Sequence, residues 1–125
     1  MKKKTIIIIA IAVFIVSSLT VLWINWQIQP GRLDDFAKCL KEKNAKFYGT
    51  FWCSYCQKQK SLFGKSAKYL PYTECSTPDG KGQMPVCKDK EFEGYPTWEF
   101  NDNSRQSGLI SLEQLSEKTG CQLPE

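Results

Sequence analysis

Two cysteines separated by two residues, Cys53 and Cys56, are the side chains of this chain best suited to covalent chemistry. They lie between a strand-like run, residues 45–50, and a helix-forming run that starts at Gln57 and ends at Gly64. A Cys at a helix start meets free backbone N–H groups and the positive end of the helix dipole, which favour its thiolate. A second Cys three residues later lies one turn away and can close a small disulfide ring. We therefore predict that Cys53 attacks and that Cys56 resolves the mixed disulfide.

The chain contains no His. This absence excludes a catalytic Cys-His pair, imidazole acid–base chemistry and imidazole metal ligation. A zinc site built from Cys53, Cys56, Cys75 and Cys87 has the right ligand type but lacks a second Cys-x-x-Cys, so we expect no metal and no cofactor. A static disulfide between Cys53 and Cys56 is the other alternative to redox chemistry.

Patterns on either side of the Cys pair predict the elements that position it. The predicted order is a helix around residues 33–40, a strand at 45–50, the Cys-x-x-Cys helix, a strand at 68–74, a weak helix at 84–92, hairpin strands at 97–100 and 105–110, and a final helix from the N-cap Ser111 to Gly120. Alternation places Trp98 and Phe100 on one face, which favours a core position for Trp98. This order packs one sheet between helices, an α/β fold.

The N-terminal region predicts a membrane segment. Residues 1–4 carry three lysines and are followed by 22 uncharged residues, 5–26, in which Ile, Val, Leu and Ala dominate. At about 1.5 Å per residue this run is roughly 33 Å long, enough to span the hydrocarbon core of a bilayer. The lysines before it, and Trp23 and Trp26 at its far end, predict a cytoplasmic N-terminus and a single-pass anchor in the cell membrane.

A cleaved signal peptide is the alternative, with a small-residue site at residues 16–18. Apolar residues continue beyond that site, which favours the anchor. Both alternatives place residues 32–125 on the periplasmic or extracellular side, after a linker at residues 27–31. Three of the 17 Lys and Arg precede the apolar run, so 14 remain against 13 acidic residues, and no nucleic-acid partner is implied.

Six cysteines in an exported domain favour disulfides in an oxidising compartment. With Cys53 and Cys56 as the redox pair, the other four allow three pairings. A Cys75–Cys87 bridge would restrain the Gly- and Pro-containing loop between them. Cys39 with Cys121 would then tie the first exported helix to the C-terminal tail. We favour this pairing, with free buried thiols as the alternative.

Three motifs resemble the thioredoxin superfamily: the run Phe51 to Cys56, the run Gly94 to Thr97 about 40 residues later, and Gly108 before the final helix. The resemblance implies a thioredoxin-like fold, a central mixed sheet flanked by helices. It also implies that Pro96 is a cis proline against the Cys pair and that Tyr95 offers its backbone to a substrate peptide. Trp52 and Tyr55, with Phe51, are candidates for an apolar docking surface for unfolded chains, with ordinary packing as the alternative.

A closer resemblance covers residues 36–123. Its motifs are the runs 46–53, 71–75 and 94–98, together with the extra pair Cys75 and Cys87. These are similar to the thioredoxin-like domain fused to, or encoded beside, bacterial membrane proteins of the vitamin K epoxide reductase family. The resemblance implies a relay in which secreted protein thiols reduce the Cys53–Cys56 disulfide and a quinone-linked membrane partner of that family reoxidises it. A single membrane anchor would replace covalent fusion by raising the local concentration of both proteins.

Two departures from the family pattern qualify this prediction. The family often has Pro-His between the active cysteines, where this chain has Ser54 and Tyr55, so we expect a milder oxidant. Cytosolic thioredoxins carry a buried carboxylate six residues before the first Cys, where this chain has Phe47. The sequence therefore does not identify the proton acceptor for Cys56, and Glu99 and Glu74 are weak candidates.

The main hypothesis is a membrane-anchored thiol–disulfide oxidoreductase that oxidises secreted protein thiols. One alternative is an exported reductase of the kind that serves cytochrome c maturation. A second alternative, from a different class, is a non-catalytic binding module held together by disulfides. The reduction potential separates the first two, and the reactivity of Cys53 and Cys56 toward mild reductant separates both from the third.

Overall fold

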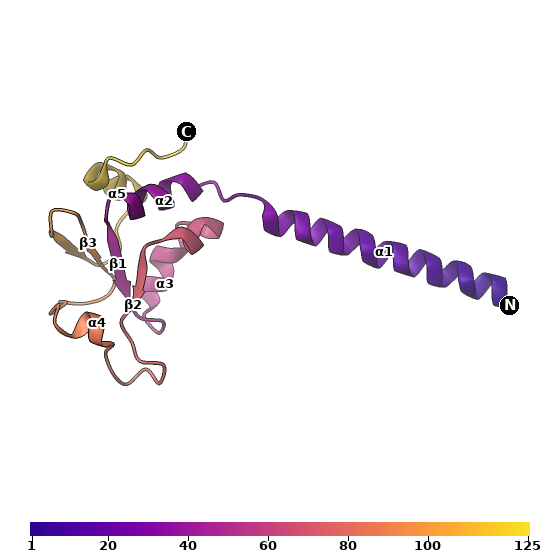
Figure 1. The fold of residues 1–125 in the computed structure, drawn as a ribbon, viewed down its shortest axis with the longest axis horizontal. Coiled ribbons are helices and arrows are strands. Elements are labelled where there is room, and N and C mark those ends of the chain that lie inside the picture. The colour runs from indigo at the N-terminus through magenta and orange to yellow at the C-terminus, as the bar shows by residue number, and fades with distance from the viewer. The chain divides into compact units, whose positions relative to one another are not determined.

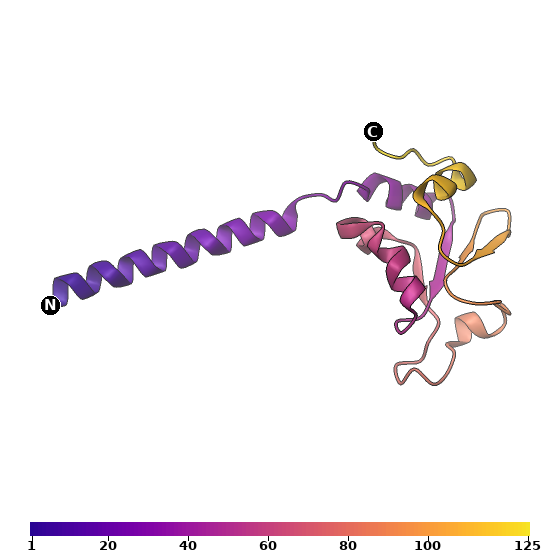
Figure 2. The same cartoon turned by 180° about the vertical axis from the view of Figure 1, so that it is seen from behind.

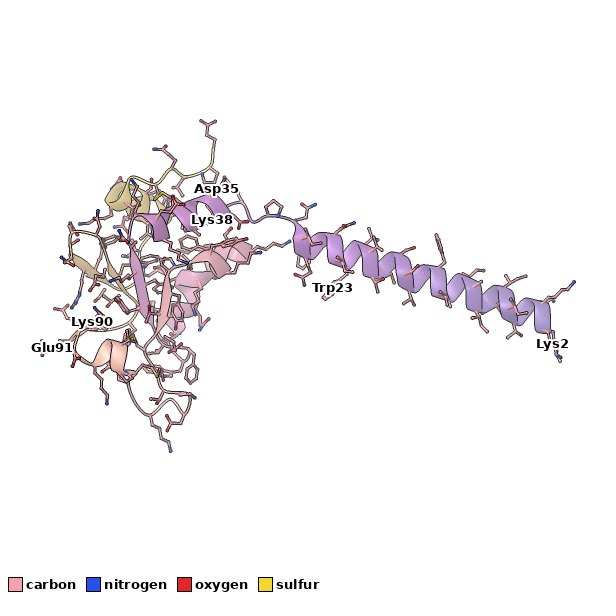
Figure 3. All side chains as sticks on the ribbon, in the orientation of Figure 1. Lys2, Trp23, Asp35, Lys38, Lys90 and Glu91 are labelled. Atoms are coloured by element: carbon pink, nitrogen blue, oxygen red, sulfur yellow. A yellow bond between two sulfur atoms is a disulfide. The ribbon has the colours of Figure 1, made fainter.

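The uncharged N-terminal run forms one long helix, α1 (Lys2–Ile28), in the computed structural model, which describes residues 1–125. None of its residues is buried, and its side chains point outward around the helix from Lys2 to Trp23 (Figure 3). By length and composition α1 is able to cross a membrane. It ends at Ile28, two residues later than the predicted anchor. The helix stops there because Pro30 disfavours the helical conformation of Gln29, the residue before it. Met1–Pro30 and Gly31–Glu125 form two separate units.

Four short strands form the sheet of the second unit, in the order β2-β1-β3-β4. They are β1 (Lys46–Gly49), β2 (Tyr72–Glu74), β3 (Thr97–Glu99) and β4 (Arg105–Ser107). β1 pairs with β2 in parallel and with β3 antiparallel, and β3 and β4 form an antiparallel hairpin. Figure 1 shows β1 between β2 and β3, and Figure 2 shows the same sheet from behind. β1 therefore delivers the chain from the middle of the sheet to the Cys pair.

The two faces of β1 support two unequal cores. Phe47 points into the main core, where its ring stacks on Trp98 with centroids 4.9 Å apart. Tyr48 points to the other face and packs against Phe92 beside the Cys75–Cys87 disulfide. This alternation follows from the two-residue period of a strand. As expected, Trp98 is fully buried.

Helices flank this sheet. They are α2 (Asp34–Glu42), α3 (Ser54–Ser61), the 3₁₀ helix η1 (Gly64–Tyr69), α4 (Pro85–Lys88) and α5 (Leu112–Thr119). The apolar face of α2 is buried as its spacing predicted, with Phe36 stacked on Phe63. The predicted capping box of α5 is confirmed, since the Ser111 hydroxyl accepts the Gln114 N–H and the Gln114 side chain accepts the Ser111 N–H. The helix ends at Gly120 with a left-handed φ of 74°.

Three predicted elements are shorter than expected by three residues or more. Residues 68 and 69 belong to η1, so the strand predicted from residue 68 begins at Tyr72, after Pro71, which cannot donate a ladder hydrogen bond. The weak helix predicted over residues 84–92 forms only at Pro85–Lys88, and the positive φ of 48° at Glu91 excludes a helix through the end of the predicted range. The last hairpin strand ends at Ser107, since Gly108 adopts a φ of 94°.

Candidate active site

Cys53 and Cys56 are free cysteines at the start of α3. Cys53 is the N-cap, and its Sγ accepts a hydrogen bond from the Cys56 backbone N–H at 3.2 Å. This capping contact arises because the strand β1 ends at Gly49 and the chain turns within four residues into a helix. The sulfur of Cys53 thus sits on the unpaired N–H groups of a helix N-terminus, an arrangement that stabilises negative charge.

The two sulfurs differ in their access to solvent. Cys53 retains 9% of its surface exposed, whereas Cys56 is 0% exposed. Burial, followed by the hydrogen bond with Cys53, raises the pKa of the Cys56 thiol to about 12. Only Cys53 can meet an external disulfide or thiol, and Cys56 is held as a protonated partner beneath it. The division into an attacking and a resolving cysteine stays a prediction, and this asymmetry is compatible with it.

The segment before β3 lies against the Cys pair, although it comes about 40 residues later in the sequence. The Cys53 thiol donates to the carbonyl oxygen of Tyr95 at 3.5 Å. The Tyr95–Pro96 peptide bond is cis, as the resemblance to thioredoxins implied, and Pro96 is fully buried. The Tyr95 ring packs on Phe92, and its hydroxyl accepts from the Gln83 amide at 2.9 Å. Tyr95 and Pro96 therefore lie beside the Cys pair, and their role in substrate binding stays a prediction.

Three aromatic side chains surround the pair and remain accessible. Phe51, Trp52 and Tyr55 are 48%, 58% and 60% exposed. Trp52 is also held in place, since its indole N–H donates to the Ser76 hydroxyl at 3.0 Å. Large apolar rings left exposed beside a reactive group are typical of a docking surface. Their exposure argues against the alternative of ordinary core packing.

The loop after β2 closes on these aromatic residues. A methyl group placed on Gly80 would lie 3.5 Å from the Phe51 ring and 3.6 Å from the Trp52 ring. A disulfide between Cys75 and Cys87 joins the two ends of this loop, and Cys39–Cys121 is the second disulfide of the structure. Both are the pairs that the sequence analysis favoured. Because Cys75 and Cys87 are joined to each other, the four-Cys zinc arrangement is not formed.

Glu74 at the end of β2 organises the turn that precedes Cys53. Its carboxylate accepts from the backbone N–H groups of Phe51 at 3.2 Å and Ser76 at 2.9 Å, and from the Tyr72 hydroxyl at 2.7 Å. It thus links the turn that carries Phe51 and Trp52 to the loop after β2, where Ser76 lies. The sequence analysis considered Glu74 only as a proton acceptor. It missed that Glu74 holds this turn and that the Ser76 hydroxyl holds the Trp52 indole. The parallel register of β1 and β2, which brings Glu74 opposite Gly49, is the signal that would have revealed it.

Glu99, the other carboxylate considered, serves a different part of the molecule. It accepts from Arg105 Nε at 2.9 Å and pairs with the Lys46 and Lys90 ammonium groups at 3.5 and 3.7 Å. Burial raises the pKa of the Glu99 carboxyl, but the Arg105 hydrogen bond and the three cations outweigh this, so the pKa lies below its usual range. A carboxylate held ionised by three cations is a poor proton acceptor, and Glu99 is a structural ion-pair centre.

The sheet order, the Cys pair at the start of α3 and the segment Tyr95–Pro96 beside it define a thioredoxin-like fold. The proteins that this chain is similar to support its place in the thioredoxin-like superfamily. It is 39% identical, over 94% of its length, to a protein of Arabidopsis thaliana named thiol-disulfide oxidoreductase LTO1. It is 31% identical, over 66% of its length, to the thioredoxin domain-containing protein 5 homolog of Drosophila melanogaster.

The chain spans 37% of the first of these relatives and 22% of the second. No family model matches the chain.

Proposed function

We propose that residues 31–125 act as a thiol–disulfide oxidoreductase in which Cys53 and Cys56 are the catalytic pair. The observation that carries this proposal is the asymmetry of the two sulfurs: Cys53 caps α3 at the surface, and Cys56 is fully buried below it. A reactive thiol needs an accessible position that favours its thiolate, and a resolving thiol needs only to reach its neighbour. The relative named thiol-disulfide oxidoreductase supports the same reaction class.

In the oxidising direction a substrate thiolate attacks Cys53 Sγ, and the Cys53–Cys56 bond breaks. Cys56 leaves with the electron pair and takes up a proton, which its raised pKa favours. A second substrate thiolate then attacks the mixed disulfide and releases Cys53 as a thiolate on the helix N-terminus. The substrate gains one disulfide and the domain two thiols. The carbonyl of Tyr95 and the rings of Trp52 and Tyr55 would bind the substrate peptide around Cys53.

We further propose that α1 anchors the domain in the cell membrane, with residues 31–125 on the outer side, where secreted protein thiols are the substrates. The length and apolar composition of α1 support this, together with the three lysines before it. A quinone-linked membrane protein similar to the vitamin K epoxide reductase family would reoxidise the Cys pair. The resemblance of residues 36–123 to domains found with such proteins supports this partner.

The test uses the full chain in detergent with reduced, unfolded ribonuclease as substrate. The wild-type chain should form disulfides in the substrate with stoichiometric loss of its own Cys53–Cys56 bond. Cys53→Ala should abolish this, and Lys58→Met, at an exposed position of α3, should not. Full activity of Cys53→Ala would contradict the proposal. Cysteines 53 and 56 that stay inert to mild reductant in the folded chain would instead support the non-catalytic binding module.

The Ser54-Tyr55 dipeptide supports a second candidate, an exported reductase, because no imidazolium lies beside the Cys53 thiolate to favour the reduced form. Equilibration of the Cys pair against glutathione decides between the directions. A potential of roughly −200 mV or higher supports disulfide formation. A potential of roughly −270 mV or lower supports a reductase fed from the cytoplasm.

A further inference from the structure

The buried thiol of Cys56 needs a group that helps it to ionise. The resolving step requires its thiolate, yet burial disfavours negative charge on this sulfur. The position that holds a buried carboxylate in thioredoxins is occupied here by Phe47, whose ring is fully buried in the main core. Glu99 is committed to its three cations. The partner of Cys56 must therefore come from another side of the sulfur.

The ring of Tyr72 lies beside Cys56. A methyl group placed on Gly49 would lie 3.0 Å from both Cys56 Sγ and Tyr72 Cε2, so the two side chains meet over the same residue of β1. The Tyr72 hydroxyl donates to Glu74 at 2.7 Å, which fixes the ring. Burial, and then the hydrogen bond to Glu74, raise the pKa of the Tyr72 hydroxyl well above its usual value. Tyr72 thus stays a neutral phenol and does not itself exchange the proton.

Lys60 supplies a positive charge at this place. It follows Cys56 by one helical turn on α3, and its side chain is half-buried. Its Nζ lies 3.4 Å from the centroid of the Tyr72 ring, a cation–π contact that holds the ammonium group on the ring that lies beside Cys56. The other Lys of this helix, Lys58, is exposed and makes no such contact with Tyr72.

The charged and polar groups around Cys56 act in opposite directions. Burial and the neighbouring Cys53 raise the pKa of Cys56, whereas the Thr50 backbone and the Lys60 charge lower it. From β2, Tyr72 faces the sulfur as a neutral ring, and Glu74 lies beyond it at the Tyr72 hydroxyl. Lys60 is the single cation among these groups.

We infer that Lys60, held over the Tyr72 ring, is the cation that stabilises the Cys56 thiolate during the resolving step. Tyr72 and Glu74 are positioning residues that keep the ammonium group in place. This inference rests on the proposed function, since it assigns a role within the Cys53–Cys56 reaction. Lys60 would thus support the second cysteine with a positive charge, where thioredoxins use the buried carboxylate that this chain lacks.

Ellman's reagent, an aromatic disulfide that releases a yellow thiolate, separates the two steps of the reaction. In the first, the Cys53 thiolate attacks the reagent, forms a mixed disulfide and releases one aromatic thiolate. In the second, Cys56 loses its proton to solvent and attacks Cys53 Sγ, which forms the Cys53–Cys56 bond and expels the second aromatic thiolate. The reagent is the oxidant for both electrons. The first phase depends on reagent concentration, and the second does not.

The experiment is stopped-flow mixing of the full chain in detergent, between pH 6 and 9, after brief reduction of the Cys pair alone. A thiol count of two per unfolded chain shows that the structural disulfides remain. Lys60→Met should slow the second phase by about three- to tenfold at pH 7 and leave the first unchanged. Each unit by which the pKa of Cys56 rises lowers its thiolate fraction tenfold, but a thiolate of higher pKa is also a stronger nucleophile, which offsets part of this loss. Lys60→Arg should retain most of the rate of the second phase, and Tyr72→Leu should slow this phase as Lys60→Met does.

Lys58→Met is the matched control and should leave both phases at wild-type rates. An unchanged second phase in Lys60→Met at every pH would overturn the inference. Equal slowing of both phases, without rescue by Lys60→Arg, would also overturn it, since that result means general damage to the fold. The equilibrium reduction potential at pH 7 should not move, because Cys56 is a protonated thiol in both chains. Absence of the first phase in the wild-type chain would contradict the proposed function itself and is thereby distinguished from failure of the Lys60 assignment.

Discussion

The carbonyl oxygen of Tyr95 lies 3.5 Å from the Sγ of Cys53, and Cys56 lies below them with no exposed surface. A substrate that lies along the backbone at Tyr95 would therefore place its sulfur on Cys53 and never on Cys56. A mixed disulfide should form at Cys53 alone and persist when nothing resolves it.

Cys56→Ser should accordingly trap substrates as stable mixed disulfides, and Cys53→Ser should trap none. The measurement is non-reducing electrophoresis of each full-length variant after incubation with a protein that contains a single disulfide. The trapped band should disappear with dithiothreitol. Comparable trapping by Cys53→Ser would contradict the assignment of Cys53 as the attacking residue.

Glu74 should matter for the turn that carries Phe51 and Trp52. Glu74→Ala removes the acceptor of the Phe51 and Ser76 N–H groups and leaves the buried Ser76 N–H unpaired, so we expect a loss of about 1–3 kcal/mol in the free energy of unfolding. Alkylation of Cys53 by iodoacetamide should also change in rate, because its N-terminal neighbours lose their position. Urea titration followed by near-ultraviolet circular dichroism measures the first effect. Glu93→Ala, at an exposed position, is the control and should change neither quantity.

The order of elements could be predicted because each has a local cause. The helical spacing of Phe36, Ala37 and Leu40 predicts α2, and Ser111 with Gln114 predicts the start of α5. The distance from Cys56 to Pro96 allowed the resemblance to thioredoxins to imply the cis bond. These signals lie within a few residues or within a motif, and the structure contains the elements that they predict.

The ends of elements and the cross-strand contacts could not be predicted in the same way. Residues 68–70 include the strand-favouring Tyr69, but Lys68 and Tyr69 belong to the 3₁₀ helix η1, which packs against α2. Lys60 and Tyr72 meet only because β2 pairs in parallel with β1 and thus lies beside α3. Periodicity within one segment carries no information on that register. The sequence therefore indicates the reactive cysteines without indicating the side chains that support the buried one.

The two structural disulfides should contribute unequally to stability. Cys39–Cys121 joins residues 82 positions apart, whereas Cys75–Cys87 joins residues 12 apart. In the chain-entropy model the longer loop stabilises by about 4.5 kcal/mol and the shorter by about 3 kcal/mol. Cys39→Ala/Cys121→Ala should therefore lower the urea midpoint more than Cys75→Ala/Cys87→Ala.

The shorter disulfide should instead affect the solvent exposure of Trp52, because its loop lies close to Phe51 and Trp52 at Gly80. Cys75→Ala/Cys87→Ala should raise the exposure of Trp52 to iodide quenching, with Cys39→Ala/Cys121→Ala as the comparison. A larger fall in the urea midpoint from loss of the shorter disulfide would contradict the loop-length argument.

Glu99 should make the fold sensitive to acid. Its side chain is 8% exposed and lies among Lys46, Lys90 and Arg105, so its pKa is lower in the folded chain than in the unfolded chain. The resulting stabilisation is fully present above the usual value of 4.5 and is lost as the pH falls through the lower value of the folded chain. Glu99→Gln should reduce the free energy of unfolding at pH 7 by about 1–2 kcal/mol, a modest figure because the cations are partly exposed.

Urea titrations of both chains at pH 7, 5, 4 and 3 provide the measurement. The difference in the free energy of unfolding between wild type and Glu99→Gln should be constant from pH 7 to 5. It should shrink below the usual pKa of a Glu carboxyl, because protonation of Glu99 in the wild type removes the same negative charge that the substitution removes. Glu117→Gln, at an exposed position of α5, should leave the free energy of unfolding unchanged throughout. A difference that stays constant down to pH 3 would show that Glu99 acts through packing and not through its charge.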